Sequence, residues 1–231
     1  MKKIFLAIIF LTISVWLIRL YFIGNLMNYI VPKYSIIVLT AAIIIGFFGI
    51  LIMIYSKQFK AINKNISWGS LLLLIVPCIL GLTVSPAPLS SVAAFNKGIQ
   101  TDISTVKIST PANFSIDSKQ RSFAEWISFL ESTTNPEDYI GKEVKITGFV
   151  LKNDELENNE FYLARFVMRC CAADAKPVGL KVISDKEITW QNDDWLEIKG
   201  VFQNSIDDKK SPEIKLSNAM VVSIPDNPYI N

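Results

Sequence analysis

The sequence predicts an α-helical membrane anchor followed by a small all-β barrel of the OB type, with one short helix beside the barrel. Apolar residues make up 51% of the 231-residue chain and are concentrated in residues 1–95, where no Asp or Glu occurs. Residues 96–231 have the mixed composition of a soluble domain. This change predicts an anchor at 1–84, an extended linker at 85–118 and a barrel domain at 119–231.

Three apolar runs predict three transmembrane helices, at about residues 4–23, 35–55 and 68–84. About 20 apolar residues cross a bilayer. The third run is the shortest and contains Pro77 and Cys78; we interpret Cys78 as a small residue packed among helices. A buried core helix is the alternative for a single run, but a soluble protein of this size rarely holds three such runs.

Positive charges predict the orientation, because cytoplasmic loops carry an excess of Lys and Arg. Lys2 and Lys3 precede the first run, three lysines lie between the second and third, and Lys33 alone lies in the other loop. We therefore expect a multi-pass protein of the cell membrane, with a cytoplasmic N-terminus and an extracytoplasmic barrel. If the third run does not span, the barrel is cytoplasmic instead.

The predicted spans offer no acidic group for transport, since the first acidic residue is Asp102. Ionisable residues inside a membrane usually mark a transport path. The anchor is therefore not expected to act as a pump or carrier by itself.

A short helix is expected next to the barrel. Ser122 and Glu125 fit a capping box. An apolar stripe follows at helical spacing, formed by Phe123, Trp126, Ile127 and Leu130. This stripe is typical of a helix that docks on a core.

Five strand-like runs separated by turn signals predict the barrel: 142–151, 160–168, 178–184, 194–203 and 213–224. Gly148 and Gly200 indicate bends or bulges. Five short strands with internal glycines suit a Greek-key barrel, with a flat sheet or sandwich as the alternative. The net charge is only +2 and this half has no basic cluster, so no nucleic-acid partner is expected.

The candidate site is the segment from Arg169 through Cys170 and Cys171 to Asp174, at the end of the second strand. Adjacent Cα atoms are about 3.8 Å apart, closer than a relaxed disulfide requires, so a bond between the two cysteines would be strained and easily reduced. On an extended strand the thiols point to opposite faces. They converge only if the backbone turns, and Asp174 favours a turn.

Three interpretations of the cysteines stay open. In the first, Cys170 and Cys171 are small buried hydrophobes at a strand end. In the second, they ligate a soft metal ion, with Asp174 as a further ligand and Arg169 favouring the thiolates. The chain has no histidine, so a Cu(I)-like site, or one shared with a partner, fits better than zinc with its four ligands. In the third, the cysteines form a redox-active pair.

No catalytic residue is expected, and we do not expect an enzyme. A nucleophilic thiol is usually activated by histidine, which is absent. No Gly-rich phosphate loop is visible, and the carboxylate pairs Asp193–Asp194 and Asp207–Asp208 fall in turns.

Four segments, together with the three apolar runs, resemble the YcgQ-like family of bacterial membrane proteins: Pro88–Ser91, Tyr139–Val144, Gly148–Val150 and Ala164–Ala175. The resemblance extends over nearly the whole chain, and the Cys-Cys-Ala-Ala-Asp-Ala run is its most specific part. Members are described as subunits of a two-component permease that pair with a separate multi-span permease protein. The resemblance thus implies a permease partner and a place in the lipid bilayer, but no substrate.

The sequence therefore predicts an accessory permease subunit. Its barrel would present a loop in which Arg169, Cys170, Cys171 and Asp174 bind a small ligand or a soft metal ion. The alternatives are a stand-alone surface protein for metal handling or thiol redox chemistry, and a purely structural surface domain.

Overall fold

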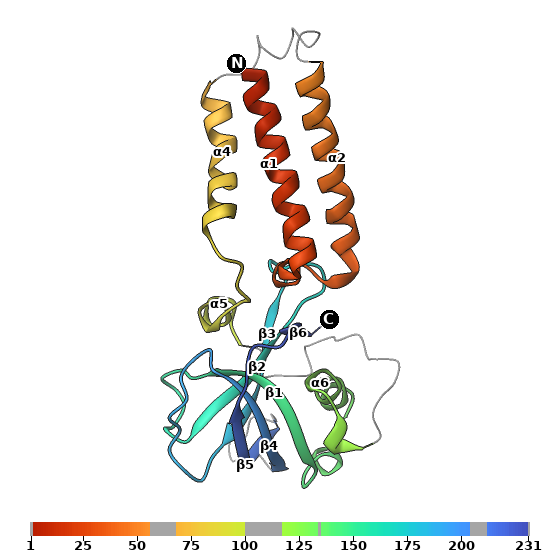
Figure 1. Ribbon diagram of the computed structural model, residues 1–231. Coiled ribbons are helices and arrows are strands. Elements are labelled where there is room, and N and C mark those ends of the chain that lie inside the picture. The colour runs from red at the N-terminus through yellow and green to blue at the C-terminus, as the bar shows by residue number, and fades with distance from the viewer. Residues whose placement is uncertain (1, 56–67, 100–116, 134, 204–211, 231) are drawn as a thin grey trace. The chain divides into compact units, whose positions relative to one another are not determined.

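The computed structural model describes residues 2–55, 68–99, 117–133, 135–203 and 212–230. The chain divides into two compact units, Met1–Pro88 and Leu89–Asn231 (Figure 1). The first unit is helical, and the second contains the sheet.

In the described part of the first unit, three helices are present: α1 (Lys2–Ile23), α2 (Ser35–Ile54) and α4 (Trp68–Thr83), with the short turns η1 (Asn25–Asn28) and η2 (Pro32–Tyr34) before α2. Leu6 and Ile9 of α1 are buried together with Ile52 of α2, and Cys78 of α4 packs against this cluster. Cys78 thus takes the packing position expected from the sequence.

Small residues let α1 and α2 approach closely. The Ser14 hydroxyl of α1 donates a 2.8 Å hydrogen bond to the carbonyl oxygen of Ala42 in α2. A Cβ on Gly46 would lie 2.6 Å from Ser14 Oγ, so this position has no room for a side chain. Small residues at such contacts are typical of helix pairs in membranes.

Two of the three predicted spans are long and apolar enough to cross a membrane: Lys3–Ile23 and Pro32–Ile54. The third is not confirmed. The helix α4 has 16 residues, contains Pro77, and has a shorter apolar stretch at Leu72–Gly81. At about 1.5 Å of rise per residue it reaches about 24 Å, which is less than the roughly 30 Å hydrocarbon core.

The second unit is built on a five-stranded barrel, as the sequence predicts. Its strands are β1 (Glu143–Leu151), β2 (Glu160–Val167), β3 (Lys176–Ile183), β4 (Trp195–Gln203) and β5 (Glu213–Val221). They pair in the order β1-β4-β5-β3-β2, and a β1–β2 pairing closes the barrel. The antiparallel order β4-β1-β2-β3 is that of a Greek key, and β5 pairs in parallel with β3.

Gly148 and Gly200 lie where two strands come unusually close. The β4–β5 register shifts between Lys199 and Gly200, which confirms the bulge expected there. A Cβ on Gly200 would lie 2.5 Å from the carbonyl oxygen of Lys215. A Cβ on Gly148 would lie 2.7 Å from the carbonyl oxygen of Ala164, next to the point where β1 passes from its pairing with β4 to its pairing with β2. Both sites allow the strands to bend into a barrel.

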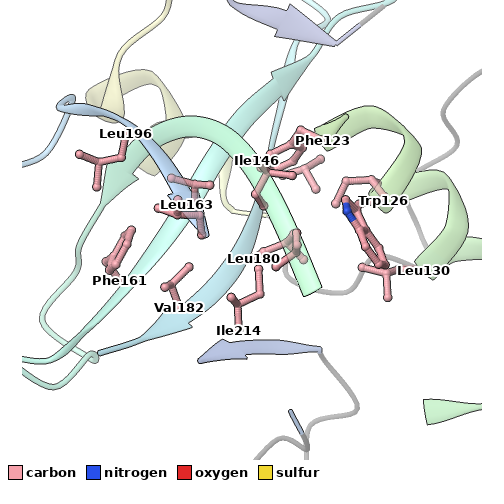
Figure 2. Packing of buried hydrophobic residues seen from close by; sticks show 14 of the residues in the cluster. Phe123, Trp126, Leu130, Ile146, Phe161, Leu163, Leu180, Val182, Leu196 and Ile214 are labelled. Carbon is pink, nitrogen blue, oxygen red and sulfur yellow. The ribbon is translucent and has the colours of Figure 1, made fainter. Parts of the chain in front are cut away.

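The helix α6 (Phe123–Ser132) packs its apolar face on the barrel core (Figure 2). It begins with the predicted capping box: Ser122 Oγ accepts from the Glu125 N–H, and Glu125 accepts from the Ser122 N–H. The Trp126 ring lies 4.7 Å from the ring of Phe202 in β4. The short turns η4 (Ser118–Gln120) and η5 (Pro136–Asp138) flank α6.

The predicted extended linker is wrong at residues 91–97, which form the helix α5 (Ser91–Lys97). Contacts with residues distant in sequence hold both of its ends, because the Asp193 carboxylate binds Ser91 and backbone carbonyl oxygens between β2 and β3 bind Lys97. No local pattern reveals these contacts. Residues 100–116 of the predicted linker lie outside the described part. The two-residue strand β6 (Tyr229–Ile230), which runs parallel to β2, was also not expected.

Candidate metal centre

The candidate site lies in the connection between β2 and β3, residues 168–175, which we call the cysteine loop. Val167 at the end of β2 pairs with Lys176 at the start of β3, so the loop leaves and re-enters one antiparallel pair. The N–H of Met168 donates to the carbonyl oxygen of Ile230 at 2.9 Å. The first residue of the loop is thereby fixed by the C-terminal strand.

A half-buried arginine holds this C-terminal segment in place. Arg165 of β2 donates from Nε to the carbonyl oxygen of Pro228 at 3.2 Å and from its terminal nitrogen to that of Asn227 at 2.6 Å. Burial lowers the pKa of Arg165 to about 10, so the guanidinium is still charged at neutral pH. The strand β6 is thus tied to β2 next to the cysteine loop.

The backbone of the cysteine loop turns as the sequence predicts. The Asp174 N–H donates to the carbonyl oxygen of Cys171 at 3.0 Å. One carboxylate oxygen of Asp174, Oδ1, accepts the Arg169 N–H at 3.1 Å. Asp174 therefore closes the turn, and Arg169 joins it through its backbone.

This turn brings the three predicted ligands together. The two Sγ atoms and a carboxylate oxygen of Asp174 all lie within 4.8 Å of one another. Two sulfur ligands on opposite sides of one metal ion, each at about 2.3 Å, would lie about 4.6 Å apart. The spacing therefore suits a single ion bound by Cys170, Cys171 and Asp174.

The site is open to solvent. Cys170 and Asp174 are exposed, Cys171 is partly buried, and neither cysteine is in a disulfide. The exposure of Cys170 does not fit the interpretation of the pair as buried hydrophobes. An ion held here by three protein ligands would keep an accessible coordination position.

Lys97 of α5 also contacts the cysteine loop, and sequence reasoning missed it. Its Nζ donates to the carbonyl oxygens of Ala172, Ala173 and Ala175 at 3.0, 2.9 and 2.9 Å. Lys97 lies 75 residues before Ala172 in the sequence, within the segment predicted to be a linker. No local signal marks it.

The other end of α5 is attached to the barrel as well. The N–H and hydroxyl of Ser91 donate to the two carboxylate oxygens of Asp193 at 2.5 and 2.7 Å. Asp193 is thus occupied by Ser91, and Asp194 accepts the Gln191 N–H at 2.8 Å. The pair Asp207–Asp208 lies outside the described residues.

The comparisons with known proteins agree with the resemblance found in the sequence. A family model described as "DUF1980 C-terminal domain" matches residues 94–231. The "UPF0703 protein YcgQ" of Bacillus subtilis (strain 168) is 26% identical over 110 residues, which is 46% of this chain and only 39% of the length of that relative.

A solved structure, "OBody AM1L10 bound to hen egg-white lysozyme", is similar over 37% of this chain and 83% of that chain, with 18% identity. Its TM-score is only 0.25, so the fold of this chain is not inferred from that structure. The family model, in contrast, covers more than half of the chain and includes every strand in the described residues and the cysteine loop. The chain therefore belongs to the DUF1980 family, in which the YcgQ-like proteins are its relatives.

Proposed function

We propose that the protein is an accessory subunit of a membrane permease, whose extracytoplasmic barrel binds a soft metal ion at Cys170, Cys171 and Asp174. The observation that carries the proposal is the convergence of these three ligand atoms to within 4.8 Å on an exposed loop. We assign the protein no catalytic step.

The two thiolates and one carboxylate favour a soft metal ion that can be passed to another molecule. Thiolates select Cu(I) and similar ions over hard cations. Structural zinc sites are closed by four ligands, whereas a site with three protein ligands accepts a fourth from water or from another molecule. An ion on the exposed cysteine loop is therefore suited to transfer to a partner.

The role as a subunit is supported by the lack of acidic residues in the apolar helices. No acidic residue occurs before Asp102, so the apolar helices supply no acidic ligand for an ion in transit. A permease pore would then belong to a separate multi-span protein, as the resemblance to YcgQ-like proteins implies. In this proposal α4 is the third span, with the local bilayer thinned around it, and the barrel lies outside the cell.

Metal binding is tested by titrating the detergent-solubilised full chain with Cu(I) against a chromogenic chelator. We expect one ion per chain, and an affinity at least about 100-fold lower in Cys170→Ser and in Cys171→Ser. The control is Cys78→Ser, which removes a thiol that packs against the helix cluster and should bind normally. Equal binding by the wild type and the Cys170→Ser, Cys171→Ser double variant would overturn the metal assignment.

Two experiments on cells test the location and the partner. A membrane-impermeant maleimide should label intact cells through Cys170, which is exposed, and should not label the double serine variant. Labelling only after lysis would place the barrel in the cytoplasm. Purification from native membranes should recover a multi-span protein, whereas recovery of a lone chain that binds metal would favour the stand-alone metal-handling alternative.

A further inference from the structure

We propose that Lys97 is a positioning residue for the metal site, and that ion binding and docking of α5 on the barrel strengthen each other. This inference rests on the proposed metal binding at the cysteine loop. Ion binding at the cysteine loop would thereby strengthen the docking of α5, the segment that follows the apolar helices in the sequence.

The contact between Lys97 and the cysteine loop uses all the hydrogen-bond donors of the lysine ammonium. A lysine ammonium has three N–H donors. Its Nζ donates to three acceptors, the carbonyl oxygens of Ala172, Ala173 and Ala175, all at 2.9 to 3.0 Å. These three residues flank Asp174 on both sides. The ammonium therefore fixes the short piece of backbone that carries the carboxylate ligand.

Charge adds to this effect. The three residues bind an ion as two thiolates and a carboxylate, and these negative charges repel one another at separations of up to 4.8 Å. The cation of Lys97, attached to the same turn, offsets part of that repulsion. Lys97 thus favours the arrangement that the ion needs before the ion arrives, as residues beyond the ligands commonly do in metal sites.

Docking of α5 includes two separate polar contacts, one at each of its ends. Ser91 is bound by Asp193, and Lys97 is bound by the cysteine loop. Because Lys97 belongs both to α5 and to the site, undocking of α5 removes the restraint on the loop. By reciprocity, if docking raises the affinity for the ion by a given factor, the ion raises the docking equilibrium of α5 by the same factor.

The test uses the detergent-solubilised full chain and Cu(I) alone. Loss of a residue that supports metal ligands typically lowers affinity about 10- to 100-fold. We therefore expect Lys97→Met to bind Cu(I) about tenfold more weakly, and Lys97→Arg, which keeps the charge and several donors, to recover most of the affinity. Ser91→Ala should also weaken binding, although Ser91 contacts Asp193 and not the loop.

A second measurement follows α5 directly. In the wild type, Cu(I) should slow amide hydrogen exchange in residues 91–97 by a factor similar to the affinity loss in Lys97→Met. In that variant Cu(I) should leave the exchange of these residues unchanged. A residue that only stabilises the fold would not produce this loss of response.

The outcomes separate the two proposals. If Lys97→Met binds Cu(I) as the wild type does while Cys170→Ser does not, the metal site stands and the role of Lys97 is refuted. If the wild type binds no better than the double serine variant, the metal site and the inference about Lys97 both fall. Lys97→Met is first checked for a cooperative thermal transition. If that transition is lost, Ser91→Ala, which leaves the cysteine loop itself unchanged, serves as the measured variant.

Discussion

Asp193 binds Ser91 across 102 residues of sequence, accepting its N–H at 2.5 Å on one carboxylate oxygen and its hydroxyl at 2.7 Å on the other. The backbone of Asp193 has a φ of 74°, a left-handed conformation that Asp and Asn tolerate better than most residues. One turn residue thus attaches α5 to the barrel, at the cost of an unusual backbone conformation.

The first prediction concerns this attachment. Asp193→Ala should lower the free energy of unfolding by about 2 kcal/mol, because it removes both acceptors and places Ala in a left-handed conformation. Asp193→Asn keeps one acceptor and the tolerated conformation, so it should cost less than half as much. Urea unfolding followed by tryptophan fluorescence measures both. Equal losses would mean that the contact with Ser91 contributes nothing.

The second prediction concerns the bulge in β4. Gly200→Ala should destabilise the barrel by more than about 2 kcal/mol, because the new Cβ would lie 2.5 Å from the carbonyl oxygen of Lys215. The matched control is Gly179→Ala in β3, where the nearest atom is the Tyr162 Cβ at 3.2 Å. Thermal unfolding should show a clearly larger decrease in Tm for Gly200→Ala; similar decreases would refute the steric explanation.

The third prediction concerns Lys181, which lies 2.9 Å from Glu160 and 3.7 Å from Glu213. Burial lowers the pKa of Lys181, but the hydrogen bond to Glu160 and the charges of both glutamates outweigh burial and raise it above 10.5. A raised lysine pKa contributes stability that is fully present below pH 10.5 and is lost as the pH rises through the folded-state value.

Lys181→Met should therefore cost about 2 kcal/mol at pH 7, because the Glu213 carboxylate, with only 2% of its side chain exposed, loses this cation. The difference from the wild type should shrink above pH 10.5. As a control, Lys145→Met removes the ion pair of a more exposed lysine with Glu197 and should cost less than about 1 kcal/mol. A difference that stays constant up to pH 12 would contradict the electrostatic explanation.

The fourth prediction concerns the packing of α1 and α2. Gly46→Ala should lower the Tm of the detergent-solubilised protein, because its Cβ would lie 2.6 Å from Ser14 Oγ. Adding Ser14→Ala removes that oxygen and leaves the next contact, Ser14 Cβ, at 3.3 Å. The double variant should therefore be more stable than Gly46→Ala alone, despite losing the hydrogen bond to Ala42. A strictly additive loss would refute the contact.

The fifth prediction separates two roles of Asp174, as a turn residue and as a metal ligand. Asp174→Asn keeps an oxygen that can accept the Arg169 N–H but loses the charge, whereas Asp174→Ala loses both. We expect both variants to bind Cu(I) at least about tenfold more weakly, and only Asp174→Ala to loosen the loop as measured by hydrogen exchange. Normal Cu(I) binding by Asp174→Asn would limit Asp174 to closing the turn.

The barrel could be predicted because its determinants are local. Alternating residues such as Phe161 and Leu163 both face the core, as the strand period requires. Gly200 marked the bulge, and Ser122 with Glu125 marked the start of α6. The strand β6 escaped prediction because two residues are too few for a periodic pattern, and because its position depends on Arg165, far away in the sequence.

The site could be predicted in part. The cysteines and Asp174 stand together in the sequence, and the turn that brings them together was expected from Asp174 itself. Whether Cys170 is exposed depends on packing around the loop, which one sequence does not reveal. Lys97 was missed for the same reason, since its role follows from tertiary contacts alone.

The hydroxyl of Tyr229 accepts the Leu89 N–H at 3.0 Å, so the first residue of the second unit touches a residue close to its last. A domain whose ends meet can be cut from one polypeptide and inserted into a surface loop of another without stretching either chain. The barrel with its cysteine loop is therefore a portable module. Residues 89–230, placed in a surface loop of a soluble host protein, would carry the proposed metal ligands and Lys97 with them.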